Sequence, residues 1–442
     1  MIRRFGAAVL LVGLIIPAGR DSTATGQTLS LQEAVALAQQ HSPLAGAAAA
    51  RVAEASAKTT EAEAAFYPML RLNSSYTASD NPVQVFMYAL NQGEFSLSSD
   101  LNNPSAADNW VASAQVGVRL FSGGRDIANW RAARAAEHGI QHVRRVTSDE
   151  MTIQVIRAFL SVLTAQELVR SATASAEAYQ ASEGVIASRV SAGTALRTEL
   201  LNIQVQKARA DERLLEATHA LTLAQENLRL AVGLDSLAYA SFGTLDDVTL
   251  SDPAAEELQE RPEIQAQTSF VSAARADLRA AQSGYFPALS AFAGIDRFQG
   301  WEFDGTKSSW SAGITLDWTI FDGFLTRSMV REKRARLKVA EEDARLLRLQ
   351  TSVELKSASL NVRQASERVT VMDRAVALAS ESALLTRQRL EQGLAISSQV
   401  IDAENALVQA DADLAQAKAD KIYAIAVLRR AQGLPIIGDD NS

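Results

Sequence analysis

The second half of this 442-residue chain repeats the first. Residues 189–234 align without a gap on residues 389–434, and thirteen of the aligned positions are identical, Gly193 among them. Phe-Ser-Gly at 121–123 matches Phe-Asp-Gly at 321–323 at the same offset of 200, and further upstream the offset becomes 219. The chain therefore folds as two equivalent units, and the first unit carries 19 extra residues ahead of its Phe-Ser-Gly turn.

Both units show the same order of expected elements. An Ala-rich helical stretch is followed by two strands, a very long helix, a Gly-marked turn and a return helix. We expect helices at about 31–65, 124–191, 196–232, 263–284, 324–391 and 396–432, and strands at about 67–77, 110–121, 287–297 and 310–321. The expected organisation is a signal peptide at 1–24, a first repeat at 25–234, a connector at 235–260, a second repeat at 261–434 and a tail at 435–442.

The expected helices are long because nothing interrupts them. No proline lies between Pro104 and Pro253, or between Pro287 and Pro435. Apolar residues recur every seven positions in two parallel series on each long helix, as in Val339, Leu346, Val353 and Leu360 or Ile153 and Leu160. Sevenfold spacing is typical of coiled coils. Two such seams favour a cylinder of helices with a neighbour on each side, and the alternative is one broad core face of a globular bundle.

The expected strands alternate between apolar and polar side chains. Residues 110–121 place Ala112, Ala114, Val116, Val118 and Leu120 on one face, and Ser113, Gln115, Gly117 and Arg119 on the other. This pattern fits either a half-buried soluble sheet or an outer-membrane barrel.

Aromatic residues favour the barrel. Of 26 Phe, Tyr and Trp residues, 17 fall within 66–121 and 285–321, gathered near the strand ends as in the interfacial girdles of barrel proteins. Four strands cannot close a membrane barrel, because the smallest bacterial barrels have about 8 strands and every edge must be paired. If these strands lie in a membrane, the protein must oligomerise.

The N-terminus has the order of a secretory signal peptide. Arg3 and Arg4 precede an apolar run at 5–18, and small and polar residues follow. The run is shorter than the ~20 residues that span a bilayer, so a signal peptide is favoured over the alternative interpretation, an N-terminal membrane anchor. No other segment is expected to approach a transmembrane helix. The chain has no Cys, which excludes disulfides and lipidation at a Cys, and its net charge of −8 disfavours nucleic-acid binding.

Taken together, the signal peptide, the duplication, the order of elements and the Phe-Tyr-Pro, Phe-Ser-Gly-Gly and Phe-Asp-Gly motifs resemble the TolC-type outer-membrane efflux family. The resemblance covers nearly the whole mature chain. It implies a mainly α homotrimer in which each chain gives four strands to a 12-stranded barrel and its long antiparallel helices form an α-barrel through the periplasm. Such proteins are passive exit ducts for efflux or type I secretion. They dock on a periplasmic adaptor and on an inner-membrane pump of the RND, ABC or MFS type.

The resemblance also assigns parts to the two ends. Loops at 78–109 and 298–309 would face outside the cell, where long loops belong. The turns Ala192-Gly193-Thr194 and Gln392-Gly393-Leu394 would contact the adaptor, although each glycine is equally explained as an ordinary helix C-cap.

The family's gate implies further positions just past the turns. Glu199 and Asp402 match acidic gate positions, and each would form a ring of three carboxylates in a trimer; the alternative is a solvated surface carboxylate. Leu390, Ala395 and Gln399 depart from the family's gate residues.

No enzymatic motif and no cofactor site is found. His138 and His142 are spaced i, i+4, which two metal ligands on one helix face would require, but no third ligand is evident, and Arg144 and Arg145 lie beside them. We therefore expect no metal site and no enzyme. The alternative to a channel is a soluble periplasmic coiled-coil scaffold.

Overall fold

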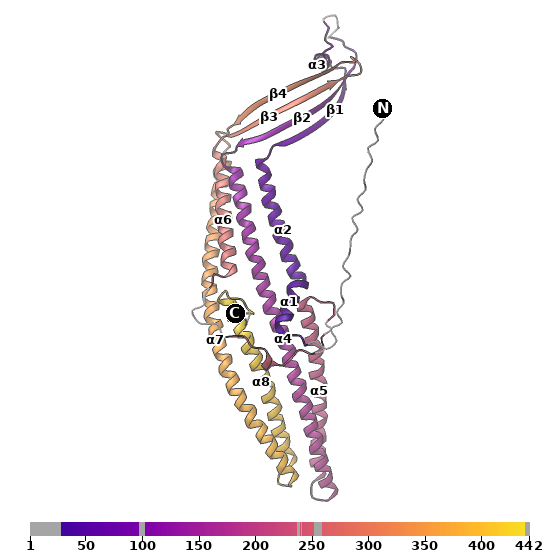
Figure 1. The fold of residues 1–442 in the computed structure, drawn as a ribbon, viewed down its shortest axis with the longest axis vertical. Coiled ribbons are helices and arrows are strands. Elements are labelled where there is room, and N and C mark those ends of the chain that lie inside the picture. Colours follow the sequence, from indigo (N-terminus) through magenta and orange to yellow (C-terminus); the bar gives the residue numbers. More distant parts are fainter. Residues whose placement is uncertain (1–27, 97–101, 237–238, 240, 252–258, 438–442) are drawn as a thin grey trace, which may run out of the picture.

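The computed structural model describes residues 28–96, 102–236, 239, 241–251 and 259–437, so the expected signal peptide lies outside the described residues. The sheet forms one end of a long, narrow molecule and two helical hairpins form the other (Figure 1). In chain order the elements are α1 (Leu31–His41), α2 (Pro43–Glu63), η1 (Ala64–Phe66), β1 (Met69–Ser79), α3 (Pro82–Gln92), β2 (Ala107–Phe121), α4 (Arg125–Ser191), α5 (Arg197–Val232), η2 (Leu245–Asp247), α6 (Pro262–Gln282), η3 (Ser283–Tyr285), β3 (Ala288–Gln299), β4 (Thr306–Asp317), α7 (Leu325–Glu391) and α8 (Ser397–Ala431).

The duplication is visible element by element. α4 and α7 both have 67 residues and start 200 positions apart, while α2 and α6 both have 21 residues and start 219 positions apart. Each long helix begins after two left-handed residues, Gly123-Gly124 in the first unit and Gly323-Phe324 in the second. The 19 extra residues lie between β1 and β2.

The structure differs from two expectations, one on a helix and one on a loop. The stretch 31–65 is two helices, α1 and α2, because Ser42 is extended (φ −65°, ψ 128°) ahead of Pro43. A residue before proline is driven out of the helical region. The loop expected at 78–109 contains a helix, α3, with Asn81 as N-cap, Pro82 in the first turn and Gly93 at the left-handed C-cap. Those three residues are the local signal for a helix start and stop.

The four strands form one antiparallel sheet in the order β1-β2-β3-β4. The register places Leu72 opposite Ala114, Ala114 opposite Ile295 and Ala293 opposite Ala312, so the apolar parities of all four strands share one face. The other face is polar, and there the Ser113 hydroxyl donates to Asp296 at 2.6 Å.

β1 and β4 are the two edges of this sheet. The fourth strand was expected at 310–321, but β4 ends at Asp317, which pairs with Ala288, the first residue of β3. In the part of the chain that the structure describes, no strand residue lies opposite 318–321, so the apolar–polar alternation there is not used in this sheet.

The main hydrophobic core lies near the middle of the molecule, where α1 and the chain between the two units pack on α4. Its fully buried members include Val155, Ile156, Phe159 and Val162 of α4. One stretch of α4 is long and apolar enough to cross a membrane by composition, although no such segment was expected, and half of it is buried within this single chain. Its apolar character therefore reflects this core.

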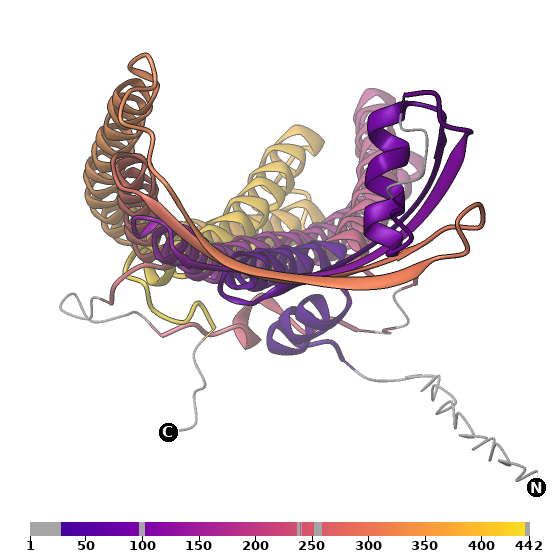
Figure 2. The ribbon, with the colours of Figure 1, turned by 90° about the horizontal axis from the view of Figure 1, so that it is seen from above.

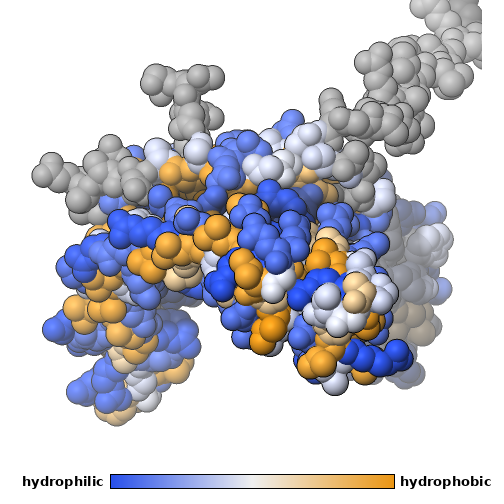
Figure 3. All heavy atoms as spheres, turned by 90° about the horizontal axis from the view of Figure 1, so that it is seen from below, coloured by the Kyte–Doolittle hydropathy of each residue, from blue (hydrophilic) through white to orange (hydrophobic). Residues whose placement is uncertain are grey.

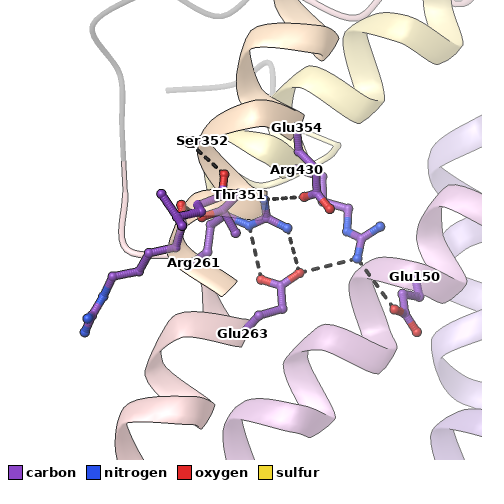
Figure 4. A network of polar contacts seen from close by, with 9 residues as sticks. Glu150, Arg261, Glu263, Thr351, Ser352, Glu354 and Arg430 are labelled. Carbon is purple, nitrogen blue, oxygen red and sulfur yellow. Dashed lines mark hydrogen bonds and ion pairs between the residues drawn. The ribbon is translucent and has the colours of Figure 1, made fainter. Parts of the chain in front are cut away.

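A polar network next to the core joins four helices (Figure 4). Arg261, the N-cap residue of α6, is 7% exposed and contacts Glu263 of α6 at 3.0 Å and Glu354 of α7 at 2.8 Å. Arg430 of α8 then contacts Glu263 at 3.3 Å and Glu150 of α4 at 3.5 Å. The network fixes the second unit against the first at mid-height.

The pKa values of two carboxyl groups in this region are shifted in opposite directions. Burial and the charge of Glu263 raise the pKa of Asp149, on α4, to about 6. Burial acts on Glu263 in the same sense, but the hydrogen bond and charge of Arg261 outweigh it and hold the pKa of Glu263 below its ordinary value. Asp149 is thus the carboxyl of the region for which ionisation is unfavourable.

Candidate functional site

Seen along its long axis, the chain is a curved wall with a concave side (Figure 2). α7 lies at one flank of the wall and α5 at the other. Both flanks carry unpartnered apolar side chains: Val339 and Val353 on α7 are 61% and 67% exposed, and Leu215 and Leu230 on α5 are 72% and 74% exposed. The heptad seams of α4 are buried in one copy, whereas those of α7 face solvent.

Aromatic side chains mark both ends of the sheet. Tyr67 lies at the helical end of β1, and Tyr76, near its other end, pairs with Trp110 of β2. The Trp110 indole donates to the Ser74 hydroxyl at 2.9 Å, and Trp301 packs edge-on against Tyr76. Tyr76 lies nine positions after Tyr67, which is about 30 Å along a strand and about 23 Å in height at the usual barrel tilt. That height matches the apolar band of an outer-membrane barrel, about 25 Å.

At the opposite end the two hairpin turns are built alike. Gly193 and Gly393 adopt left-handed φ values of 75° and 77°. Thr194 N–H donates to the Arg189 carbonyl at 2.8 Å, and Leu394 N–H donates to the Arg389 carbonyl at 2.7 Å. These are Schellman-type C-caps, so the glycines have a structural role whatever else the turns bind. Ala192 and Gln392 are the C-cap residues of α4 and α7.

An apolar cluster just above the turns joins the α4–α5 hairpin to the α7–α8 hairpin. It contains Tyr179 and Ile186 of α4, Ile203 and Ala210 of α5, Leu390 of α7, Ala395 of the turn and Val400 of α8. Leu390 and Ala395, the positions that depart from the family's gate, are 1% and 4% exposed. Apolar packing therefore holds the hairpins together at these positions.

Polar contacts flank the cluster. The Arg189 guanidinium donates to the Leu390 carbonyl at 3.4 Å across the hairpins. Glu404 of α8 is 2% exposed and pairs with Arg387 of α7 at 3.1 Å. Burial raises the pKa of Glu404, and the charge of Arg387 opposes the shift. Burial, together with the Glu404 charge, raises the pKa of Tyr179 to about 12.

Sequence reasoning missed Glu404 and its partner. The position 200 residues earlier is Gln204, which donates to Glu183 of α4 at 2.9 Å. The first hairpin thus carries its carboxylate on the long helix, and the second carries it on the return helix. The repeat alignment shows that the position is polar in both units, but only packing shows that Glu404 is buried.

The expected gate carboxylates lie near the same end. Glu199 is partly buried in the first turn of α5, and Asp402 is exposed on α8. Among the described residues, no side-chain hydrogen bond or ion pair joins either carboxylate to another group. Gln399 accepts the Ile396 N–H at 3.4 Å and so caps α8. Seen from below, polar and apolar side chains alternate over the hairpin ends (Figure 3).

A duplicated chain with a two-faced membrane-type sheet at one end and long paired helices at the other defines one segment of an outer-membrane channel. Residues 34–234 and 254–434 match the family model described as outer membrane efflux protein. The chain belongs to this family.

Curated relatives agree with this placement. The chain is similar to protein CyaE of Bordetella pertussis, with 26% identity over 348 residues, covering 76% of this chain and 70% of CyaE. It is 29% identical over 219 residues to the cobalt-zinc-cadmium resistance protein CzcC of Cupriavidus metallidurans (48% of this chain, 51% of CzcC). It is 23% identical over 305 residues to the alkaline protease secretion protein AprF of Pseudomonas aeruginosa (66% and 63%).

Solved structures share the fold. The outer-membrane channel OprN superposes with a TM-score of 0.79 at 18% identity, over 92% of this chain and 90% of OprN. VceC of Vibrio cholerae superposes with a TM-score of 0.78 at 18% identity, over 92% and 96%.

Proposed function

We propose that three copies of this chain form one passive exit duct of a tripartite efflux pump or a type I secretion system. The observation that carries the proposal is the sheet: it has one apolar face, and its edges, β1 and β4, pair with no further strand among the described residues of a single copy. Unpaired backbone groups cost several kcal/mol each in hydrocarbon. Pairing β4 of one copy with β1 of the next satisfies both edges, and three copies of four strands close a 12-stranded barrel.

The flanks of the wall support the same assembly. Apolar seams remain exposed on α5 and α7, at opposite sides of the copy. In a ring these flanks meet, and α7 gains the second neighbour that its two exposed seams require. The helices then continue the barrel as a tunnel into the periplasm. Export from the cytosol relies on the signal peptide at 1–24, and the absence of Cys means that the duct is not lipidated.

The hairpin turns are the proposed adaptor contacts, at Ala192, Gly193 and Thr194 and at Gln392, Gly393 and Leu394. Leu394 is 65% exposed. Leu196 and Ile396, which occupy equivalent positions in the two repeats, are 67% and 52% exposed. Exposed apolar residues gathered at one end mark an interaction surface. An inner-membrane pump of the RND, ABC or MFS type supplies the energy. The names of two relatives, a cobalt-zinc-cadmium resistance protein and an alkaline protease secretion protein, support metal ions or a protein as candidate cargo.

Two measurements test the duct. The protein is expected in the outer-membrane fraction, and on gels it migrates as a trimer that heating converts to monomer; a soluble monomer would instead support the scaffold alternative. Asp402→Asn is expected to change the cation dependence of the conductance in planar bilayers, because a ring of carboxylates favours cations. An unchanged current–voltage curve removes Asp402 from the gate and leaves the trimer standing.

A further inference from the structure

The helix α3 lies on the concave side of the sheet at its outer end (Figure 2). It contacts β2, β3 and β4. Gln92, 1% exposed, donates to the Asp108 carbonyl at 2.8 Å and to the Asn109 side chain at 3.1 Å. Asn109 and Lys307, which approaches Gly93, both belong to the polar parity of their strands. α3 is therefore fixed to the polar face of the sheet.

The end of α3 packs tightly against the turn between β3 and β4. A Cβ added to Gly300 would lie 2.2 Å from Gln92 Oε1, and one added to Gly305 would lie 2.8 Å from its backbone carbonyl. Asp108 in turn accepts the Trp301 and Glu302 N–H groups at 3.1 and 2.9 Å. The end of α3, the end of β2 and the β3–β4 turn thus form one packed unit.

α3 has two opposite apolar faces. Val85, Tyr88, Ala89 and Gln92 are buried against the sheet end, with Ala107 and Phe303 nearby. Val83, Met87 and Leu90 are exposed at 70%, 46% and 38%. At 3.6 residues per turn the centres of these two groups lie about 180° apart around the helix. Because one group faces the sheet, the other faces away from it, toward the space that the concave side encloses.

The exposed residues Val83, Met87 and Leu90 form an apolar stripe along α3. The dimensions of the barrel limit what this stripe can contact. A 12-stranded barrel with strands about 4.8 Å apart and tilted about 40° has a backbone radius of about 12 Å. A helix with its side chains is about 10 Å thick. Three such helices laid on the inner wall leave an opening of at most about 4 Å. Residues on the stripe of one copy then lie within reach of the same residues in the other two.

We propose that the three copies of α3 form an apolar constriction at the outer exit, lined by Val83, Met87 and Leu90, which limits what passes by size and polarity. This inference rests on the trimer of the proposed function. Apolar side chains that would otherwise face water in the lumen are covered by one another, which accounts for an exposed stripe on a helix whose other face is firmly packed.

The test uses the absence of native Cys. Gln115→Cys places one thiol on the polar face of β2, eight positions inward from Ala107. Intact cells are treated with a maleimide on a polyethylene glycol of about 2 kDa, which reaches the lumen only through the outer mouth. The triple change Val83→Ala, Met87→Ala and Leu90→Ala is expected to raise the labelling rate at least tenfold.

Matched controls define the result. Gln84→Ala, on α3 but off the stripe, is expected to leave the rate unchanged, and Glu302→Cys at the rim is expected to label rapidly in every background. Each stripe residue is also changed singly, in case the triple variant fails to assemble. Equal rates in the wild-type and stripe variants, with the trimer band present, overturn the constriction alone. Loss of the trimer band in the wild-type protein overturns the duct and the constriction together.

Discussion

The apolar cluster at the hairpin ends gives a sharp test through Leu390. Leu390 is 1% exposed in the last turn of α7, and it packs in the cluster that joins the two hairpins. Leu394, four residues on, is 65% exposed. Replacing a buried leucine with alanine costs about 2–5 kcal/mol. At about 3 kcal/mol, the equilibrium between joined and separated hairpins shifts roughly 150-fold in each copy.

Leu390→Ala is expected to increase hydrogen exchange at 385–400 and to raise the fraction of time that single channels conduct in planar bilayers. Leu394→Ala is the matched control, with the same chemical change at an exposed position and an expected effect near zero. If Leu390→Ala exchanges and conducts like Leu394→Ala, the cluster does not hold the hairpins together. The exchange measurement does not depend on the channel proposal, so it tests the packing argument by itself.

Three further outcomes follow from the geometry. Because burial raises the pKa of Asp149 to about 6 from 3.8, ionisation opposes folding across that range, so stability falls as pH rises through it. Asp149→Asn is expected to stabilise the protein by about 1 kcal/mol at pH 8, after discounting for solvent screening, and by nothing below pH 4, as thermal melts in detergent will show. Burial also raises the pKa of Glu404, so exchange protection of α8 is expected to fall as the pH rises above 4.5, the ordinary pKa of a Glu side chain. Glu404→Gln is expected to abolish this pH dependence, and a dependence that persists would assign it to another group. Gly123→Ala is expected to prevent assembly, since its Cβ would lie 2.6 Å from the Ser283 carbonyl, whereas Gly124→Ala, with open space around it, costs about 1 kcal/mol; equal trimer yields on gels would contradict this.

Much of the fold could be predicted because its signals are local. The repeat offset gives the starts of α4 and α7 to within a residue, and the parity of side chains gives the two faces of the sheet. The predicted elements were wrong where a local signal for a helix start was not used, as at Pro43 and Asn81-Pro82. They were also wrong where an element's end depends on residues distant in the sequence. The end of β4 depends on where β3 begins, 29 residues earlier. Whether Glu199 and Asp402 act in a gate stays a prediction.

The order of residues alone predicts that this chain is duplicated and largely helical, because repeats and heptads can be read from it directly. It also predicts that four strands need further copies to close a membrane barrel. Which of two similar heptad series is buried depends on the packing of the folded chain. The seams of α4 pack into the core and those of α7 do not, and Glu404 is enclosed while Asp402, two residues away, is exposed. Whether a side chain is buried depends on which elements pack against its face of the helix, and those elements come from distant parts of the chain.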